Sequence, residues 1–220
     1  HAMTTLSTGG YSGYDASFGH FDSAFLQWVC TAFMLAGALP FAWYIRGVRR
    51  GVWQSEQVSA MLTTLALTIS GLSLWLMMVR GETLFDALRL VAFNVVSIVT
   101  TTGYATTDYT LWGPFAVAAF FVLTAVGGAT GSTAGGAKAM RWLVAGRALI
   151  AQIRKSYAPH RVTFVKYEGR PVAPDALSGV IAFFVLYSAT FGVMAILLSF
   201  FGQDMSTAIS GSLTALANVG

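Results

Sequence analysis

A chain of 220 residues with 55% hydrophobic and only 10% charged residues is too apolar for a soluble domain, in which about a quarter of the residues are charged. The net charge of +4 does not indicate nucleic-acid binding, because the basic residues are divided between separate connections and form no single patch with exposed aromatic side chains. One cysteine, Cys30, excludes an internal disulfide, and the histidines show no ligand spacing, so we expect neither a metal site nor a cofactor. The composition therefore predicts an all-α membrane protein.

Two long uncharged runs follow the N-terminal segment. Residues 23–45 predict a spanning helix that ends at Arg46, with a kink at Pro40, and residues 57–79 predict a second span. No basic stretch or Ala-x-Ala site opens the chain. We expect a fragment that begins and ends within repeated elements.

A shorter apolar run over residues 90–99 leads into Thr100-Thr101-Thr102-Gly103-Tyr104. Its ten residues are about half of the roughly 20 that a helix needs to cross a bilayer, so we expect a segment that enters the membrane and returns. Irregular backbone at that depth must be buried in protein or line a water-filled cavity. An extended Thr-Thr-Gly segment there would present carbonyl oxygens that can replace the water around a monovalent cation.

The same pattern occurs again at both ends of the chain. Residues 7–15 align without a gap on residues 100–108, with Thr, the second Gly, Tyr and the trailing Asp in common. Ala217-Asn218-Val219-Gly220 follows the short apolar run 206–216 and fits the same frame. One copy alone would be typical of a turn. The repetition favours three quarters of an ion filter.

Glycines interrupt what would otherwise be one long helix after residue 109. Each glycine disfavours a helix by about 1 kcal/mol relative to alanine, and residues 127–138 contain several. We interpret this stretch as a flexible loop beneath the filter that gates the pore. Two alternatives are a phosphate-binding loop, although Gly136-Ala137-Lys138 lacks the required Gly-Lys-Ser/Thr, and close helix packing by small residues. Lys138 either anchors the loop or opposes cations electrostatically.

Charge predicts the orientation. Basic residues gather in two connections, around residues 46–50 and 138–170, which the positive-inside rule makes cytoplasmic, so the filter copies face outward. The acidic residues of the opposite side form either a cation-concentrating ring or ordinary solvated loops; they are Asp15, Asp22, Glu82, Asp86, Asp108 and Asp204. Residues 161–170 predict a small cytoplasmic hairpin that serves either as a docking point or as a connector. A final span is predicted over residues 176–203.

The residues 93–104, the loop 127–138 and the ending Ala217-Asn218-Val219-Gly220 together resemble the TrkH/KtrB potassium-uptake proteins, along essentially the whole chain. The resemblance implies repeated helix–pore loop–helix units around one pore, a homodimer, and a cytosolic nucleotide-binding regulatory subunit of the TrkA/KtrA kind. It also implies a place in the bacterial inner membrane. On that plan, residues 1–50 end the second unit, 51–155 form the third, 156–174 connect, and 175–220 form the fourth up to its filter.

The resemblance also implies the site residues. Potassium coordination falls on Thr8, Gly9, Gly10, Thr101, Thr102, Gly103, Asn218, Val219 and Gly220. Gating falls on Gly127, Gly128, Gly131, Ser132, Thr133, Gly135, Gly136 and Lys138. The expected function is potassium uptake without enzymatic activity, with the bilayer as surroundings. Alternatives are a sodium-coupled or sodium-permeable relative and a membrane enzyme that holds a phosphorylated substrate.

Overall fold

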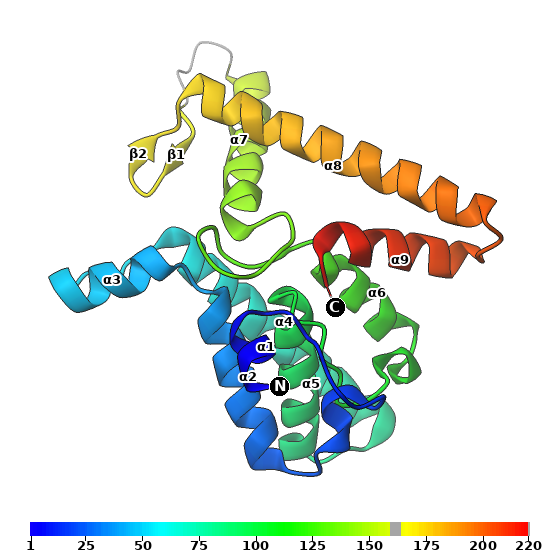
Figure 1. Cartoon of the computed structure of the whole chain (residues 1–220). Coiled ribbons are helices and arrows are strands. Elements are labelled where there is room, and N and C mark those ends of the chain that lie inside the picture. Colours follow the sequence, from blue (N-terminus) through cyan, green and yellow to red (C-terminus); the bar gives the residue numbers. More distant parts are fainter. Residues whose placement is uncertain (159–163, 220) are drawn as a thin grey trace.

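The computed structural model describes residues 1–158 and 164–219, which are mostly helical (Figure 1). The helices are α1 (Ala2–Leu6), α2 (Ala24–Ala38), α3 (Phe41–Arg50), α4 (Glu56–Arg80), α5 (Leu84–Val99), α6 (Pro114–Thr124), α7 (Ala139–Tyr157), α8 (Pro174–Phe200) and α9 (Met205–Ala217). Two 3₁₀ turns, η1 (Ser17–His20) and η2 (Tyr109–Trp112), and two short strands, β1 (Lys166–Tyr167) and β2 (Arg170–Pro171), complete the described part.

Two of these helices are long and apolar enough to cross a membrane. They are α4, with a mean hydropathy of 1.8, and α8, with a mean hydropathy of 2.3. The bent pair α2 and α3 would make a third span if it crosses as one unit. An apolar helix of this length that leaves most of its side chains exposed, as α8 does, requires apolar surroundings. The prediction of an all-α membrane protein is confirmed.

The predicted single span over residues 23–45 is wrong in its shape. α2 and α3 are separate helices whose axes differ by 88°, a far sharper break than a kink. Pro40 has no amide hydrogen and pushes Leu39 into extended backbone (φ −89°, ψ 152°), which ends α2 there. The carbonyl groups of Gly37 and Ala38, which lose helical partners at the break, accept hydrogen bonds from Thr133 N (3.2 Å) and Ala129 N (3.1 Å). The break is thus stabilised by the glycine-rich loop.

α5 is the centre of the molecule. It packs against α4, α2 and α6, and every residue from Val91 to Val99 is buried. With 16 residues it is longer than the apolar run alone predicted, because Thr83 begins it by accepting a hydrogen bond from Asp86 N. A helix of that length extends about 24 Å and still ends short of a full crossing. Its C-terminal end therefore lies inside the protein.

The helix break after α6 lies where the glycines predict it. α6 ends at Thr124 and α7 begins at Ala139, and the connecting residues 125–138 form a loop without regular structure. In Figure 1 this yellow-green loop runs between α1 and the end of α9. The amide of Ala139 returns to the carbonyl of Gly128 (3.0 Å), which closes the loop on itself.

The hairpin is shorter than the sequence predicts. β1 and β2 pair antiparallel through Tyr167 and Arg170, with Glu168 and Gly169 forming the turn. Residues 161–163 of the predicted first strand lie outside the described residues. Both turn residues have positive φ (51° and 74°), the left-handed geometry that tight hairpin turns require.

Candidate functional site

Three short helices, α1, α5 and α9, end in the same backbone motif. At the end of α5, Thr101 N donates to Ile98 O (3.0 Å) and Thr102 N donates to Ser97 O (2.8 Å). This combination is the Schellman motif, which usually needs a glycine. The equivalent pairs are Thr8 N to Thr5 O with Gly9 N to Thr4 O, and Asn218 N to Ala215 O with Val219 N to Thr214 O.

Each motif holds a residue other than glycine in the left-handed region. The φ angles are 52° for Thr8, 57° for Thr101 and 58° for Asn218. Left-handed backbone costs about 1–2 kcal/mol for a residue with a side chain, and a β-branched residue such as threonine rarely adopts it. Strain of this kind persists only where the surroundings enforce it, and it gathers at functional sites. The three sequence copies therefore share one unusual backbone geometry.

The first and second copies lie in backbone contact. A β-carbon built on Gly10 would lie 1.8 Å from the carbonyl oxygen of Thr102, so no side chain fits between the two segments. Gly10 and Gly103 both have positive φ (66° and 82°), each two residues after the strained threonine. Gly10 therefore contacts the residue that precedes its aligned counterpart, Gly103, 93 positions away.

Tyr104 joins these two copies through its hydroxyl group. Its side chain is only 1% exposed, and its Oη lies 2.5 Å from Thr4 Oγ1 of α1. The same oxygen lies within 3.2 Å of the His1 carbonyl and 3.3 Å of the Tyr11 carbonyl. The aromatic ring of the second copy therefore supports the backbone of the first.

Side chains of α5 hold the segment that leaves the second copy. Ser97 Oγ donates to Tyr104 O (2.7 Å), and Asn94 Nδ2 donates to Thr106 Oγ1 (2.8 Å). In return Thr106 N donates to Asn94 Oδ1 (3.3 Å). The chain after the helix end therefore runs back along α5.

The carbonyl oxygens of the second copy lack hydrogen-bond donors among the described residues. Within residues 1–158 and 164–219, no protein hydrogen bond ends on the carbonyl oxygen of Thr101, Thr102 or Gly103, although Thr101 and Thr102 are buried. Buried backbone carbonyls are nearly always paired, so a row of unpaired ones calls for another partner. Oxygen ligands without negative charge suit a monovalent cation.

The third copy is described up to Val219. Asn218 and Val219 carry the same motif as the other copies, and Gly220 lies outside the described residues. The sequence-predicted pair Asn218 and Val219 thus shares its backbone geometry with Thr8 and Gly9.

The loop 125–138 contacts all three copies. The hydroxyl oxygens of Thr133 and Thr8 lie 3.2 Å apart, and Gly135 N donates to Thr101 Oγ1 (2.6 Å). A β-carbon on Gly135 would lie 2.6 Å from the carbonyl oxygen of Ala217, at the end of α9. The loop therefore lies directly against the three helix ends.

The remaining loop residues named from the sequence shape the loop itself. Gly127 and Gly136 lie in backbone contact, since a β-carbon on either would lie 2.6 Å from an atom of the opposite strand of the loop. Ser132 Oγ donates to Ala129 O (2.6 Å), and Gly131 O accepts from Phe41 N (3.0 Å) at the start of α3. A β-carbon on Gly128 would lie 2.3 Å from that of Ala134.

Lys138 lies at the end of the loop with a positive φ of 70°. Its Nζ donates to the carbonyl oxygen of Ala134 within the loop. This is the type of contact expected of an anchor, and it directs the ammonium group at the loop backbone.

Three of the acidic residues that the sequence predicts on the outer side, Asp86, Asp108 and Asp204, lie at helix starts. Asp204 accepts from Ser206 N and Thr207 N (3.1 Å each), and Asp108 accepts from Thr110 N (2.9 Å). Hydrogen bonds from the side chain and backbone of its neighbours, Ser206 first, hold the pKa of Asp204 well below its usual range. Asp86 has a lowered pKa because of Thr83 and Arg89. The hydrogen bonds of these three carboxylates are made to residues of their own helical turn.

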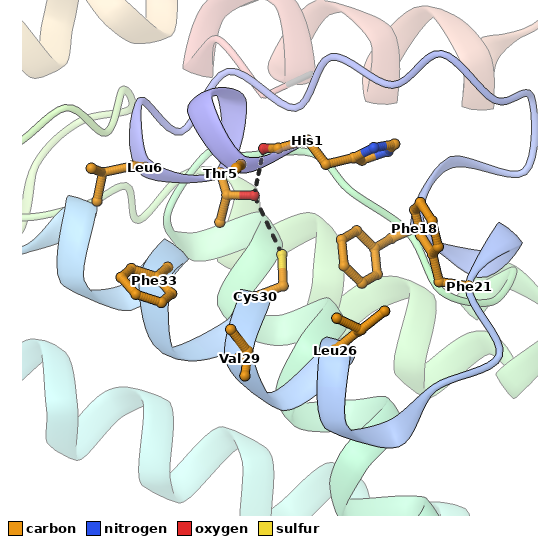
Figure 2. A pocket seen from close by; sticks show the side chains of 10 residues that line it. His1, Thr5, Leu6, Phe18, Phe21, Leu26, Val29, Cys30 and Phe33 are labelled. Carbon is orange, nitrogen blue, oxygen red and sulfur yellow. Dashed lines mark hydrogen bonds between the residues drawn. The ribbon is translucent and has the colours of Figure 1, made fainter.

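An apolar pocket lies beside the first copy, between α1 and α2 (Figure 2). Its volume is about 410 Å³, and its walls are mainly aromatic and aliphatic, with Phe18 and Phe33 among them. The polar contacts drawn in Figure 2 join Thr5 Oγ1 to the His1 carbonyl (2.8 Å) and to Cys30 Sγ (3.6 Å). With so few polar atoms the pocket suits no ion. It marks the support of α1 on α2.

No cluster of three or more metal-ligating side chains occurs in the part of the chain that the structure describes. Comparison with known proteins then assigns the family. A sequence model of the TrkH family, described as a cation transport protein, matches residues 1–79 and 57–220. The chain belongs to the TrkH family.

Relatives within the TrkH family match along the whole chain. The Trk system potassium uptake protein TrkI of Halomonas elongata is 45% identical over 224 residues, which cover 100% of this chain and 45% of that protein. The Trk system potassium uptake protein TrkH of the same organism is 34% identical and is covered to 46%. The crystal structure of the potassium transporter TrkH from Vibrio parahaemolyticus matches with a TM-score of 0.94 at 28% identity, covering 100% of this chain and 48% of that chain. The chain spans about half the length of these relatives.

Membership of the TrkH family and the apolar helices make this an integral membrane protein. The sequence did not indicate the roles of several residues that support the site. Asn94 and Ser97 bind the segment after α5, Tyr104 binds Thr4 of the first copy, and Gln57 binds Thr130 of the loop. Asn94 and Ser97 carried a signal, since polar residues three apart in an apolar helix mark one polar face. Gln57 had none, because its partner is 73 positions away.

Proposed function

We propose that the full-length protein carrying this chain conducts potassium into the cell through carbonyl sites at the ends of α1, α5 and α9. The observation that carries the proposal is the row of carbonyl oxygens at Thr101, Thr102 and Gly103, which accept no protein hydrogen bond from the described residues; Thr101 and Thr102 are buried, and the motif recurs in the other two copies. Carbonyl oxygens that replace a hydration shell bind a dehydrated alkali ion, and several weak sites in sequence let it leave again. The potassium-uptake names of the relatives agree with this ion.

The loop 125–138 is the proposed gate. It contacts all three copies, and its glycines permit the backbone changes that opening requires. Lys138 has the role of an anchor in this proposal, since its Nζ is directed at the carbonyl of Ala134.

The proposed setting is the bacterial inner membrane, with the three copies facing outward and the basic connections inside. The proposed partners are a second copy of the same protein and a cytosolic nucleotide-binding subunit of the TrkA/KtrA kind. No step requires a cofactor or an enzymatic reaction.

A sodium-permeable or sodium-coupled transporter is the second candidate. It is favoured by the third copy, where Asn218 and Val219 replace the two threonines and make the coordination unequal. Measurement of rubidium uptake with and without external sodium separates the two candidates.

The test uses Gly103→Ser in the full-length protein. Because Gly103 has positive φ and lies two residues after the strained Thr101, a side chain at Gly103 displaces the carbonyl row. We expect rubidium uptake to fall by at least about tenfold or discrimination against sodium to be lost. Gly81→Ser is the matched control, since Gly81 has a similar φ of 67° at the end of α4 and nothing within 4 Å of its β-position. Normal rubidium flux with intact discrimination in Gly103→Ser would exclude the proposed filter.

A further inference from the structure

The first residues of α4 contact three other parts of the molecule. Ser55, Glu56 and Gln57, here called the α4 junction, follow one another directly in the chain. They bind the hairpin, α7 and the loop 125–138. Nothing in the motif of the three helix ends explains this arrangement.

The side-chain amide of Gln57 makes two hydrogen bonds to the backbone of Thr130 in the loop. Thr130 N donates to Gln57 Oε1 (3.0 Å), and Gln57 Nε2 donates to Thr130 O (3.4 Å). The Gln57 side chain is 9% exposed, so water does not readily replace it. Within a membrane protein an unpaired backbone group is costly, so the rest position of the loop depends on this amide.

Glu168 of the hairpin supplies the cap that the start of α4 lacks. Ser55 makes no side-chain cap of its own. Instead Ser55 Oγ and Glu56 N both donate to Glu168 Oε1, at 2.9 and 3.0 Å. A carboxylate at a helix N-terminus pairs with free amides and opposes the positive end of the helix dipole. Glu168 thus holds the helical turn that carries Gln57.

Arg147 adds a connection to α7. Its Nη1 lies 2.6 Å from Glu56 Oε2 and donates to the Lys166 carbonyl (2.6 Å) on β1. α7 begins directly after the loop, at Ala139. The α4 junction therefore connects the hairpin to the loop in two ways: directly through Gln57, and through α7, which follows the loop in the chain.

We propose that Gln57 is a positioning residue for the loop and that Glu168 controls it through the first turn of α4. When Glu168 moves away, Ser55 Oγ and Glu56 N lose their hydrogen-bond acceptor. The first turn of α4 then frays, and the side-chain amide of Gln57 no longer binds Thr130. A contact that moves the cytoplasmic hairpin is in this way transmitted to the loop. The consequence for ion flow rests on the proposed function, whereas the coupling itself does not.

The test follows the loop directly, in the full-length protein. Cys30→Ala removes the cysteine of this chain, other native cysteines are replaced as well, and Ser132→Cys places one probe in the half-buried middle of the loop. The measured quantity is the rate at which a small cationic methanethiosulfonate reagent modifies position 132. Gln57→Met has the same length as glutamine without the amide, so it separates hydrogen bonding from packing.

We expect Gln57→Met to raise the modification rate about tenfold, as the loss of two hydrogen bonds predicts. Glu168→Ala is expected to raise the modification rate about fivefold, which is the effect of a lost helix cap. Glu168→Gln is expected to raise the rate by less, because the amide oxygen of glutamine still accepts a hydrogen bond. The double variant Gln57→Met with Glu168→Ala is expected to match Gln57→Met alone, because both act through one contact. The matched controls are Gln54→Ala and Asp175→Ala, which alter exposed residues near the starts of α4 and α8. Both control variants should leave the modification rate unchanged.

The proposal is overturned if Gln57→Met leaves the rate unchanged, or if the effects of Gln57→Met and Glu168→Ala multiply. Glu168→Ala alters a half-buried residue of the two-residue hairpin turn and keeps the coupling testable even if Gln57 variants are poorly produced. If the rates behave as expected while Gly103→Ser conducts normally, the coupling stands and the proposed function fails. If Gly103→Ser is inactive and the rates do not change, the coupling alone is wrong.

Discussion

Gly10 lies where the backbones of the first two copies are in contact. Its β-position lies 1.8 Å from the carbonyl oxygen of Thr102, and its φ is 66°. Both conditions exclude a side chain, the first by backbone overlap and the second by left-handed strain. The internal alignment predicted a glycine in this frame, because Gly10 falls on Gly103. The reason for it, a contact between distant segments, could not be read from the alignment.

Gly10→Ala is expected to separate the first copy from the second. The strained backbone and the overlap together should destabilise this contact by at least about 2 kcal/mol, and rubidium uptake by the full-length protein should be lost. Gly13→Ala is the control, since a β-carbon at Gly13 meets nothing within 4 Å. Equal uptake by the two variants would show that the first two copies need not touch.

At the scale of single elements, short helices depend on their caps. α9 has 13 residues and is capped by Asp204, whose carboxylate accepts from Ser206 N and Thr207 N. A cap stabilises such a helix because its first amides otherwise lack partners. The position of α9 decides where the third copy, Asn218 and Val219, lies. The cap at the N-terminus of α9 therefore affects the position of the third copy at its C-terminus.

The cap of α9 is expected to weaken in acid. The pKa of Asp204 is lowered in the folded protein by the hydrogen bonds from Ser206 and Thr207. A lowered pKa means that the charged carboxylate stabilises the fold at neutral pH, and that this contribution is lost as the pH falls below about 4 towards the folded pKa. Hydrogen exchange of the first amides of α9 measures this loss: their protection factors should decrease as the pH falls below about 4.

Asp204→Asn is the matched variant for that measurement. Asparagine caps helices about as well as aspartate but does not titrate. The protection factors of the variant's first amides should therefore lack the acid-dependent decrease. A pH profile shared by both proteins would place the titration elsewhere.

At the scale of the whole molecule, Gly37 is the point where three distant segments meet. A β-carbon at Gly37 would lie 2.4 Å from the carbonyl oxygen of Leu6 and 3.2 Å from Thr133 Oγ1. The Gly37 carbonyl also accepts from Thr133 Oγ1 (2.9 Å). α1, the end of α2 and the loop are thus packed against one small residue.

Gly37→Ala is expected to push α1 and the loop away from α2 and to abolish rubidium uptake by the full-length protein. Within an exposed helix the same substitution should be favourable by up to about 1 kcal/mol, because alanine is the better helix former. Gly71→Ala in α4 provides this comparison, since nothing lies within 4 Å of its β-position. If Gly37→Ala takes up rubidium as well as Gly71→Ala does, the close packing of the three segments is unimportant for transport.

Four features could be predicted from the amino-acid sequence alone: the membrane class, the long helices α4 and α8, the broken helix after α6, and the matching frames around Gly10 and Gly103. All of these depend on local quantities: the length of an apolar run, glycine content and repeated spacing. The tertiary structure decided the 88° turn between α2 and α3, because the loop amides of Ala129 and Thr133 take the carbonyls that Pro40 frees. It also decided the partners of Gln57 and Tyr104, which lie 73 and 100 positions away in the chain. Such contacts form between segments whose sequences carry no signal for one another, so only folding brings them together.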